Sequence, residues 1–325
     1  MHFGCSYFYL DDFVSVGAIA MTGFFLLSGY ALRLVYGEQD LMEKQNLGRF
    51  YQKRIVSIIP IYYFFAFLYI LLNGKESLVD NLLLFPVEAL GLQTTFTSLF
   101  CVTHNGGTWF VSCILLAYFI YPFLQTVSKQ LKGRYKVLLL LLLIFVDVWG
   151  AVISHKFHTA EIYDNPFYRI VEFACGLLVA DINIEYDNKL LKALRSWGIL
   201  IGSSVALLVG VSLMRHYLHY EDYMLYNVLV LPCFAVMLFS LGALKMPLLE
   251  KSKGVSYLSK ISYAFFLAQF FAWDFGRKAI EWIGLNNKLW RVIYTLSFCI
   301  IVSALAYELI QKPISHLILK KTKQS

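Results

Sequence analysis

Long apolar blocks separated by short charged segments dominate this sequence, and they constrain its fold more than any other feature. A helix of about 18 or more apolar residues is long enough to cross a hydrocarbon core of roughly 30 Å. Of the 325 residues, 59% are apolar and only 15% are charged, whereas soluble domains average about 25% charged residues. We therefore predict an all-α fold, a polytopic transmembrane helix bundle with nine spans at 13–32, 55–73, 107–127, 137–154, 165–182, 197–214, 225–244, 256–273 and 291–311.

One further apolar stretch, 78–100, differs from these blocks because Asp80, Pro86 and Glu88 interrupt it. We predict that it lies at the membrane interface or packs into the bundle. No fixed-period repeat and no Pro/Ser linker divides the chain, so residues 1–325 are predicted to form a single integral membrane domain. Because the loops are short, any chemistry must use residues of the helices and their ends.

The distribution of Lys and Arg predicts the orientation, since basic residues are retained on the cytoplasmic side. Alternate connecting segments hold 20 of the 28 basic residues, and the segments between them hold 8. This predicts an N-terminus outside the cytoplasm and a C-terminus inside. The basic-rich segments are 33–54, 128–136, 183–196, 245–260 and 312–325.

Charge and cysteine usage exclude other classes of site. The net charge of +7 is spread over short runs between apolar blocks and is not gathered on one face, so we predict no nucleic-acid partner. The six cysteines form no C-x-x-C pair, and most lie inside apolar blocks. We predict no metal site, no disulfide framework and no bound cofactor.

Six short segments carry polar residues where a plain membrane span would not place them. Each alone is weak evidence, because a segment such as FFLLSG could simply be a small-residue seam between helices. Together, and in this order, they resemble the acyltransferase type 3 family, whose members are integral membrane enzymes that O-acylate sugars and cell-envelope glycans. The segments are Phe24–Tyr30, Phe50–Arg54, Trp109–Ser112, Arg169–Phe173, Ile261–Gln269 and Tyr307–Pro313.

The resemblance implies one more helix than the nine predicted here, and that first helix would carry an Arg followed by an essential His near its outer end. The His at the matching distance before FFLLSG is His2. The chain is therefore expected to lack most of the first helix of the family pattern, and His2 is expected to be the catalytic base. Imidazole suits this role because it titrates near neutral pH. The alternative is an N-terminal residue without a function.

The resemblance implies that the donor is acetyl-coenzyme A, or another acyl-coenzyme A, acting as a co-substrate. Lys53 and Arg54, with Arg49 nearby, are expected to bind its phosphates at the cytoplasmic face. Ordinary membrane anchors that reach toward lipid headgroups are the alternative for these residues.

The expected acceptor cleft contains charged and aromatic side chains. Arg169 and Glu172 are three residues apart on one helix face and can pair, either in the cleft or as a structural ion pair. Trp109 and Tyr118 could stack on a sugar ring or belong to the aromatic belt of the interface. The last two candidates are Tyr263 and Gln269, and Gln269 replaces a His that is frequent in the family.

Two further acidic residues, Asp147 and Asp181, lie near span ends in the sequence. We predict that both are solvated and exclude them from the site.

These patterns favour a membrane-bound acyltransferase that transfers acetyl from acetyl-coenzyme A to a hydroxyl of a cell-envelope or exported polysaccharide, or of a lipid-linked sugar. Its expected partners are the acyl donor, the glycan acceptor and membrane lipids, and its expected location is the bacterial cytoplasmic membrane, as a multi-pass protein. Two alternatives remain open. One is a polysaccharide or lipid transporter or flippase, which would also keep charges within the membrane. The other is an inactive, shortened member of the family.

Overall fold

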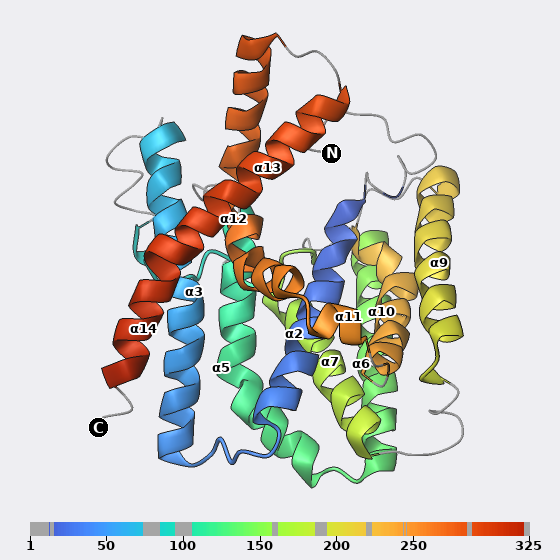
Figure 1. Ribbon diagram of the computed structural model, residues 1–325. Helices are drawn as coiled ribbons and strands as arrows, with labels where there is room; N and C mark the ends of the chain where they lie inside the picture. Colours follow the sequence, from blue (N-terminus) through green and yellow to red (C-terminus); the bar gives the residue numbers. More distant parts are fainter. Residues whose placement is uncertain are drawn as a thin grey trace. The chain divides into compact units, whose positions relative to one another are not determined.

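The computed structural model describes residues 13, 16–73, 85–94, 106–157, 162–185, 194–218, 223–242, 244, 246–284 and 288–321. These residues form helices joined by turns and short connections, and no strand occurs among them (Figure 1). The predicted all-α class is confirmed.

The contacts between residues divide the chain into two compact units. Unit 1 combines the described parts of 6–47 and 116–245, and unit 2 combines those of 48–115 and 246–325. Two helices, α3 and α5, contribute residues to both units, so this grouping does not decide the prediction of a single domain. Each unit is described by itself below.

Unit 1 is built around helix α7, whose residues 171–182 are buried without interruption. Helices α2, α6 and α10 contact α7, and α9 packs against α10. The second part of α5 completes the unit, together with three short helices. The bounds are η2 Gly17–Ile19, α2 Ala20–Tyr36, α5 Trp109–Gln130, α6 Gly133–Phe157, α7 Pro166–Glu185, α9 Trp197–Leu213, η5 Met214–Leu218, η6 Tyr223–Tyr226 and α10 Asn227–Leu241.

Two glycines bring the backbones of α2 and α7 into direct contact. A Cβ added at Gly29 would lie 1.9 Å from the carbonyl oxygen of Phe173, and one added at Gly176 would lie 1.8 Å from that of Leu26. Any side chain at either position would therefore push the helices apart. The small-residue seam considered for FFLLSG is present.

Unit 2 contains a long C-terminal arm. Helix α12 packs along α13, and Figure 1 shows α13, the π-helix η7 and α14 running on as one rod. Gln311 of η7 donates from Nε2 to the carbonyl oxygen of Ser57 on α3, at 2.9 Å. The bounds are α3 Lys44–Asn73, η4 Gly106–Thr108, α11 Pro247–Glu250, α12 Lys253–Ile283, α13 Lys288–Ala306, η7 Tyr307–Gln311 and α14 Lys312–Lys321.

All nine predicted spans coincide with helices. By length and composition, seven helical segments of the described chain could cross a membrane, and α7 and α12 are the two that fall outside this set. Helix α7 falls short because charged side chains, among them Arg169, Glu172 and Asp181, interrupt its apolar sequence, yet these side chains are buried within unit 1.

The stretch 78–100 is described from Phe85 to Thr94, and it packs into unit 2. Tyr62 donates a hydrogen bond of 2.5 Å to the carbonyl oxygen of Glu88, and Gln93 Nε2 donates to that of Thr108 at 2.9 Å. Gln93 is fully buried, so this part of the stretch fits the second of the two predicted placements.

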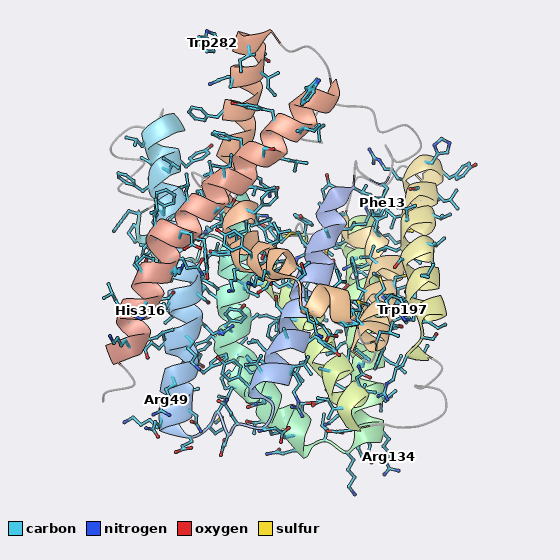
Figure 2. The ribbon with its side chains drawn as sticks, in the orientation of Figure 1. Phe13, Arg49, Arg134, Trp197, Trp282 and His316 are labelled. Atoms are coloured by element: carbon cyan, nitrogen blue, oxygen red, sulfur yellow. The ribbon has the colours of Figure 1, made fainter. Side chains whose placement is uncertain are left out.

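Contacts in unit 1 bring three of the basic-rich segments to one end, as the predicted orientation requires. Lys129 donates from Nζ to the carbonyl oxygen of Gln39 at 2.8 Å, and Arg33 and Lys136 meet at the end of α7. Figure 2 shows Arg134 at this end of the unit and Phe13 at the opposite end. Which end faces the cytoplasm remains a prediction from the charge rule.

Candidate functional site

Five buried polar side chains from four helices meet inside unit 1, and we call them the central polar cluster. None is more than 2% exposed. The close contact of α2 with α7 at the two glycines allows a side chain as short as that of Thr22 to reach Glu172 of α7. The cluster consists of Thr22 of α2, Asp147 of α6, Arg169 and Glu172 of α7, and Asn227 of α10.

Arg169 is held from several sides. Its Nη1 donates to both carboxylate oxygens of Glu172, each at 2.8 Å, and its Nε and Nη2 donate to the carbonyl oxygen of Tyr163 at 2.8 and 2.5 Å. The guanidinium also lies over the rings of Tyr163 and Phe25, at 4.8 and 5.7 Å from their centroids. The pairing predicted from the spacing of Arg169 and Glu172 is present, and this geometry favours its structural alternative.

Most of the remaining hydrogen bonds of the cluster converge on Glu172, although the hydroxyl of Thr22 also lies 3.0 Å from a second acceptor, Oδ1 of Asn227. Oε1 of Glu172 receives hydrogen bonds from Thr22 Oγ1 at 2.8 Å and from Asn227 Nδ2 at 3.0 Å, besides that from Arg169. Asn227 Nδ2 also donates to Oδ2 of Asp147, at 2.7 Å. Three helices are thereby tied to α7 through one carboxylate and one amide.

A second group, the inner charge cluster, joins the opposite ends of α2, α6 and α7. Arg33 Nε donates to Oδ1 of Asp181, and Lys136 Nζ lies 3.5 Å from the other carboxylate oxygen. Lys136 also pairs with Glu185, and Ser128 of α5 donates to Asp181. The two cations face the carboxylates of Asp181 and Glu185, and Arg33 also lies 3.6 Å from the exposed carboxylate of Glu38.

The prediction that Asp147 and Asp181 are solvated is wrong, since both are 0% exposed. Their positions near span ends suggested access to water, but side chains from neighbouring helices cover both. Eleven residues separate Lys136 from Asp147 on α6, which corresponds to about 16 Å along the helix axis. Asp147 thus lies about half a hydrocarbon thickness deeper than the inner charge cluster.

The residues expected to bind the donor lie together on α3. Arg49 and Lys53 are exposed and one helical turn apart, and the adjacent Arg54 is half-buried. Figure 2 shows Arg49 at one end of unit 2 and Trp282 at the other, as expected if segment 33–54 is inside and segment 274–291 is outside. The structure does not test their role.

The other predicted site residues are distributed over both units. Trp109 begins α5 and is 5% exposed, with Phe110 beside it. In unit 1, the ring of Tyr118 meets that of Phe173 edge-on. In unit 2, Tyr263 donates at 3.4 Å to the carbonyl oxygen of Ile58.

Gln269, on α12, is half-buried. His2 lies outside the described residues. Arg169 and Glu172 are hydrogen-bonded to each other.

Sequence reasoning missed Thr22, Asn227 and Asp147 as members of a charged cluster. A signal was available for Asn227, because an amide within an apolar block needs hydrogen-bonding partners that lipid cannot supply. Thr22 offered none, since a Thr can bond back to the carbonyl of its own preceding turn.

These features define the class: a polytopic, all-helical membrane protein whose bundle keeps ionisable side chains away from lipid. A family model described as an acyltransferase domain matches residues 2–308. The chain therefore belongs to the acyltransferase type 3 family, and it is an acyltransferase. No curated protein and no solved structure matches it.

Proposed function

We propose that this membrane acyltransferase moves an acetyl group from acetyl-coenzyme A to a hydroxyl of a cell-envelope or exported polysaccharide, or of a lipid-linked sugar. The observation that carries the proposal is the family match over residues 2–308. The bacterial cytoplasmic membrane, with the donor on the cytoplasmic side, is part of the same proposal.

The basic residues of α3 are proposed to hold the donor. Lys53 and Arg49 are exposed on one face of the helix, and Arg54 follows directly. Phosphate groups favour such a set, because Arg offers a planar fork of donors and Lys a mobile ammonium group. Their exposure leaves these cations accessible to an anionic ligand from the aqueous side.

The chemistry of the transfer requires a base at the acceptor hydroxyl and a donor for the developing oxyanion. His2 is proposed as the base. Trp109, Tyr118, Tyr263 and Gln269 are proposed to line the acceptor cleft. For Arg169 and Glu172 the proposal is narrower: they shape that cleft by fixing α7, since their own hydrogen bonds lie within the bundle.

The test uses the purified full chain in detergent with radiolabelled acetyl-coenzyme A and a set of envelope glycans. We expect label in the glycan and release of free coenzyme A. His2→Ala should abolish transfer while acetyl-coenzyme A still binds. Glycan binding without any turnover would contradict the proposal and favour a transporter.

A pair of variants on α3 tests the donor site. Lys53→Ala should raise KM for acetyl-coenzyme A about tenfold or more, because a hydrogen bond between charged groups is worth about 1.5–3 kcal/mol. Lys44→Ala is the matched control, since Lys44 is exposed on the same helix but lies about 2.5 turns from Lys53. Equal KM values for the two variants would refute the assignment of Lys53.

A further inference from the structure

The two buried clusters of unit 1 differ in charge balance. In the inner charge cluster, Arg33 and Lys136 face the carboxylates of Asp181 and Glu185, with the exposed Glu38 beside Arg33, so every carboxylate there has a cation as its partner. In the central polar cluster, Arg169 is the one cation within the described part of the chain, and it faces two carboxylates. With both of these ionised, the cluster would hold an uncompensated negative charge deep in the bundle.

Such a charge is unfavourable at this depth. A lone charge near the centre of a membrane-spanning helix costs at least about 2.5 kcal/mol, and a buried carboxyl group commonly avoids the cost by taking up a proton. Two carboxyl groups that share one site also disfavour simultaneous ionisation. One proton restores neutrality to the cluster.

The hydrogen bonds indicate which carboxyl group takes the proton. Glu172 receives hydrogen bonds from Arg169 on both oxygens and has Thr22 and Asn227 as additional donors, so its environment stabilises the carboxylate. Within the described part of the chain, Asp147 receives one hydrogen bond, from Asn227 on Oδ2. Its Oδ1 is buried and has no hydrogen-bonding partner among the described residues.

We propose that the central polar cluster is a buried proton-binding site, in which Asp147 carries the proton as a neutral carboxylic acid and Glu172 remains ionised beside Arg169. On folding, the Asp147 carboxylate takes one proton from the solvent, and no other bond is made or broken. The inference does not depend on the donor or acceptor of the acyl transfer.

The other titratable groups around the pair do not replace this proton. Tyr168 and Cys175 of α7 face Asp147, and both are neutral acids near pH 7. Tyr163, with Tyr223 and Asp164 beyond it, faces Arg169. None of these groups adds a positive charge to the cluster.

The arrangement of donors argues against a metal cation as the ligand. Asn227 turns its amide nitrogen toward both carboxylates, at 2.7 and 3.0 Å, whereas a sodium or calcium ion would require oxygen atoms there. A proton on Asp147 is compatible with these hydrogen bonds as they stand.

Infrared spectroscopy of the purified full chain in lipid bilayers at pH 7 tests the proposal directly. We expect a C=O stretching band of a protonated carboxylic acid that shifts when aspartate is labelled with carbon-13. Asp147→Asn should remove the band, and Asp181→Asn should leave it unchanged. Asp181 is the matched control, because it is equally buried but paired with two cations.

Thermal unfolding gives a second measurement. Asp147→Asn replaces a neutral acid by a neutral amide of the same shape, so its melting temperature should stay within about 2 °C of the wild type. Glu172→Gln removes the carboxylate to which Arg169 donates two hydrogen bonds and should lower the melting temperature by several times that amount.

Three results would overturn the proposal: no acid band in the wild type, a band that survives Asp147→Asn, or stabilisation by sodium at constant ionic strength. The spectrum of the labelled wild type shows whether the acid band exists, so the proposal can be refuted even if a variant fails to fold.

Discussion

Replacing Gly176 by Ala tests the contact on which unit 1 depends. The new Cβ would lie 1.8 Å from the carbonyl oxygen of Leu26, and real Cβ atoms essentially never approach closer than 3.0 Å. The backbones of α2 and α7 must therefore separate locally by about 1.2 Å, the difference between these two distances. Neither side can yield by rotating a side chain, because the obstructing atom belongs to the backbone.

Overpacking of this kind costs about 1–3 kcal/mol, and a gap of 0.5–1 Å already forfeits a quarter to a half of the dispersion energy of each contact. We expect a loss near the upper limit, about 3 kcal/mol, and a melting temperature lower by roughly 5–10 °C. The hydrogen bond from Thr22 to Glu172 should weaken as well, because it joins the same two helices.

The assay is heating in detergent with a thiol-reactive dye, which labels buried cysteines such as Cys175 when the bundle opens. Gly202→Ala is the control, because Gly202 is exposed on α9 and a Cβ there meets nothing within 4 Å. This control should be neutral or up to about 1 kcal/mol more stable, since Ala favours a helix over Gly. Identical melting curves for Gly176→Ala and the wild type would refute the reasoning.

Two further predictions concern charge. Asp181→Asn leaves Arg33 and Lys136 buried without their shared carboxylate, so it should lower the free energy of unfolding by about 3–5 kcal/mol, as measured by thermal unfolding. A loss below about 1 kcal/mol would contradict the importance of the inner charge cluster. Burial raises the pKa of Tyr163 to about 12 from 10.0, so the folded state holds the phenol proton more tightly than the unfolded state does. This difference stabilises the folded state fully below pH 10, and the stabilisation is lost as the pH rises through 12. The melting temperature of Tyr163→Phe should equal that of the wild type at pH 7 and should fall less above pH 10, as measured over a series of pH values. An equal fall for both proteins would count against this effect of burial.

Much of the fold could be predicted because the relevant signals are local. A membrane span shows itself as a continuous apolar block, and all nine predicted blocks are helical. The Arg169–Glu172 pair could also be predicted, since residues three apart share a helix face whatever surrounds the helix. The order of six short segments sufficed for the family.

The candidate site could be predicted only in part, because its members come from helices far apart in sequence. Thr22 and Glu172 are separated by 150 residues, and Asn227 and Asp147 by 80. Nothing in the local sequence links Thr22 to Glu172 or Asn227 to Asp147. Only the packing of α2, α6 and α10 around α7 brings them together.

The sequence by itself determined that this chain is a helical, multi-spanning membrane acyltransferase, because span length, hydropathy and the ordered motifs are properties of contiguous residues. Tertiary structure alone decided whether Asp147 and Asp181 are buried and which groups they contact. Asp147 and Asp181 were both predicted to be solvated, yet both are buried. Asp181 meets two cations, whereas Asp147 meets an amide and a second carboxylate. The electrostatic energy of a buried group depends on its neighbours in space, and those neighbours are set by how the helices pack.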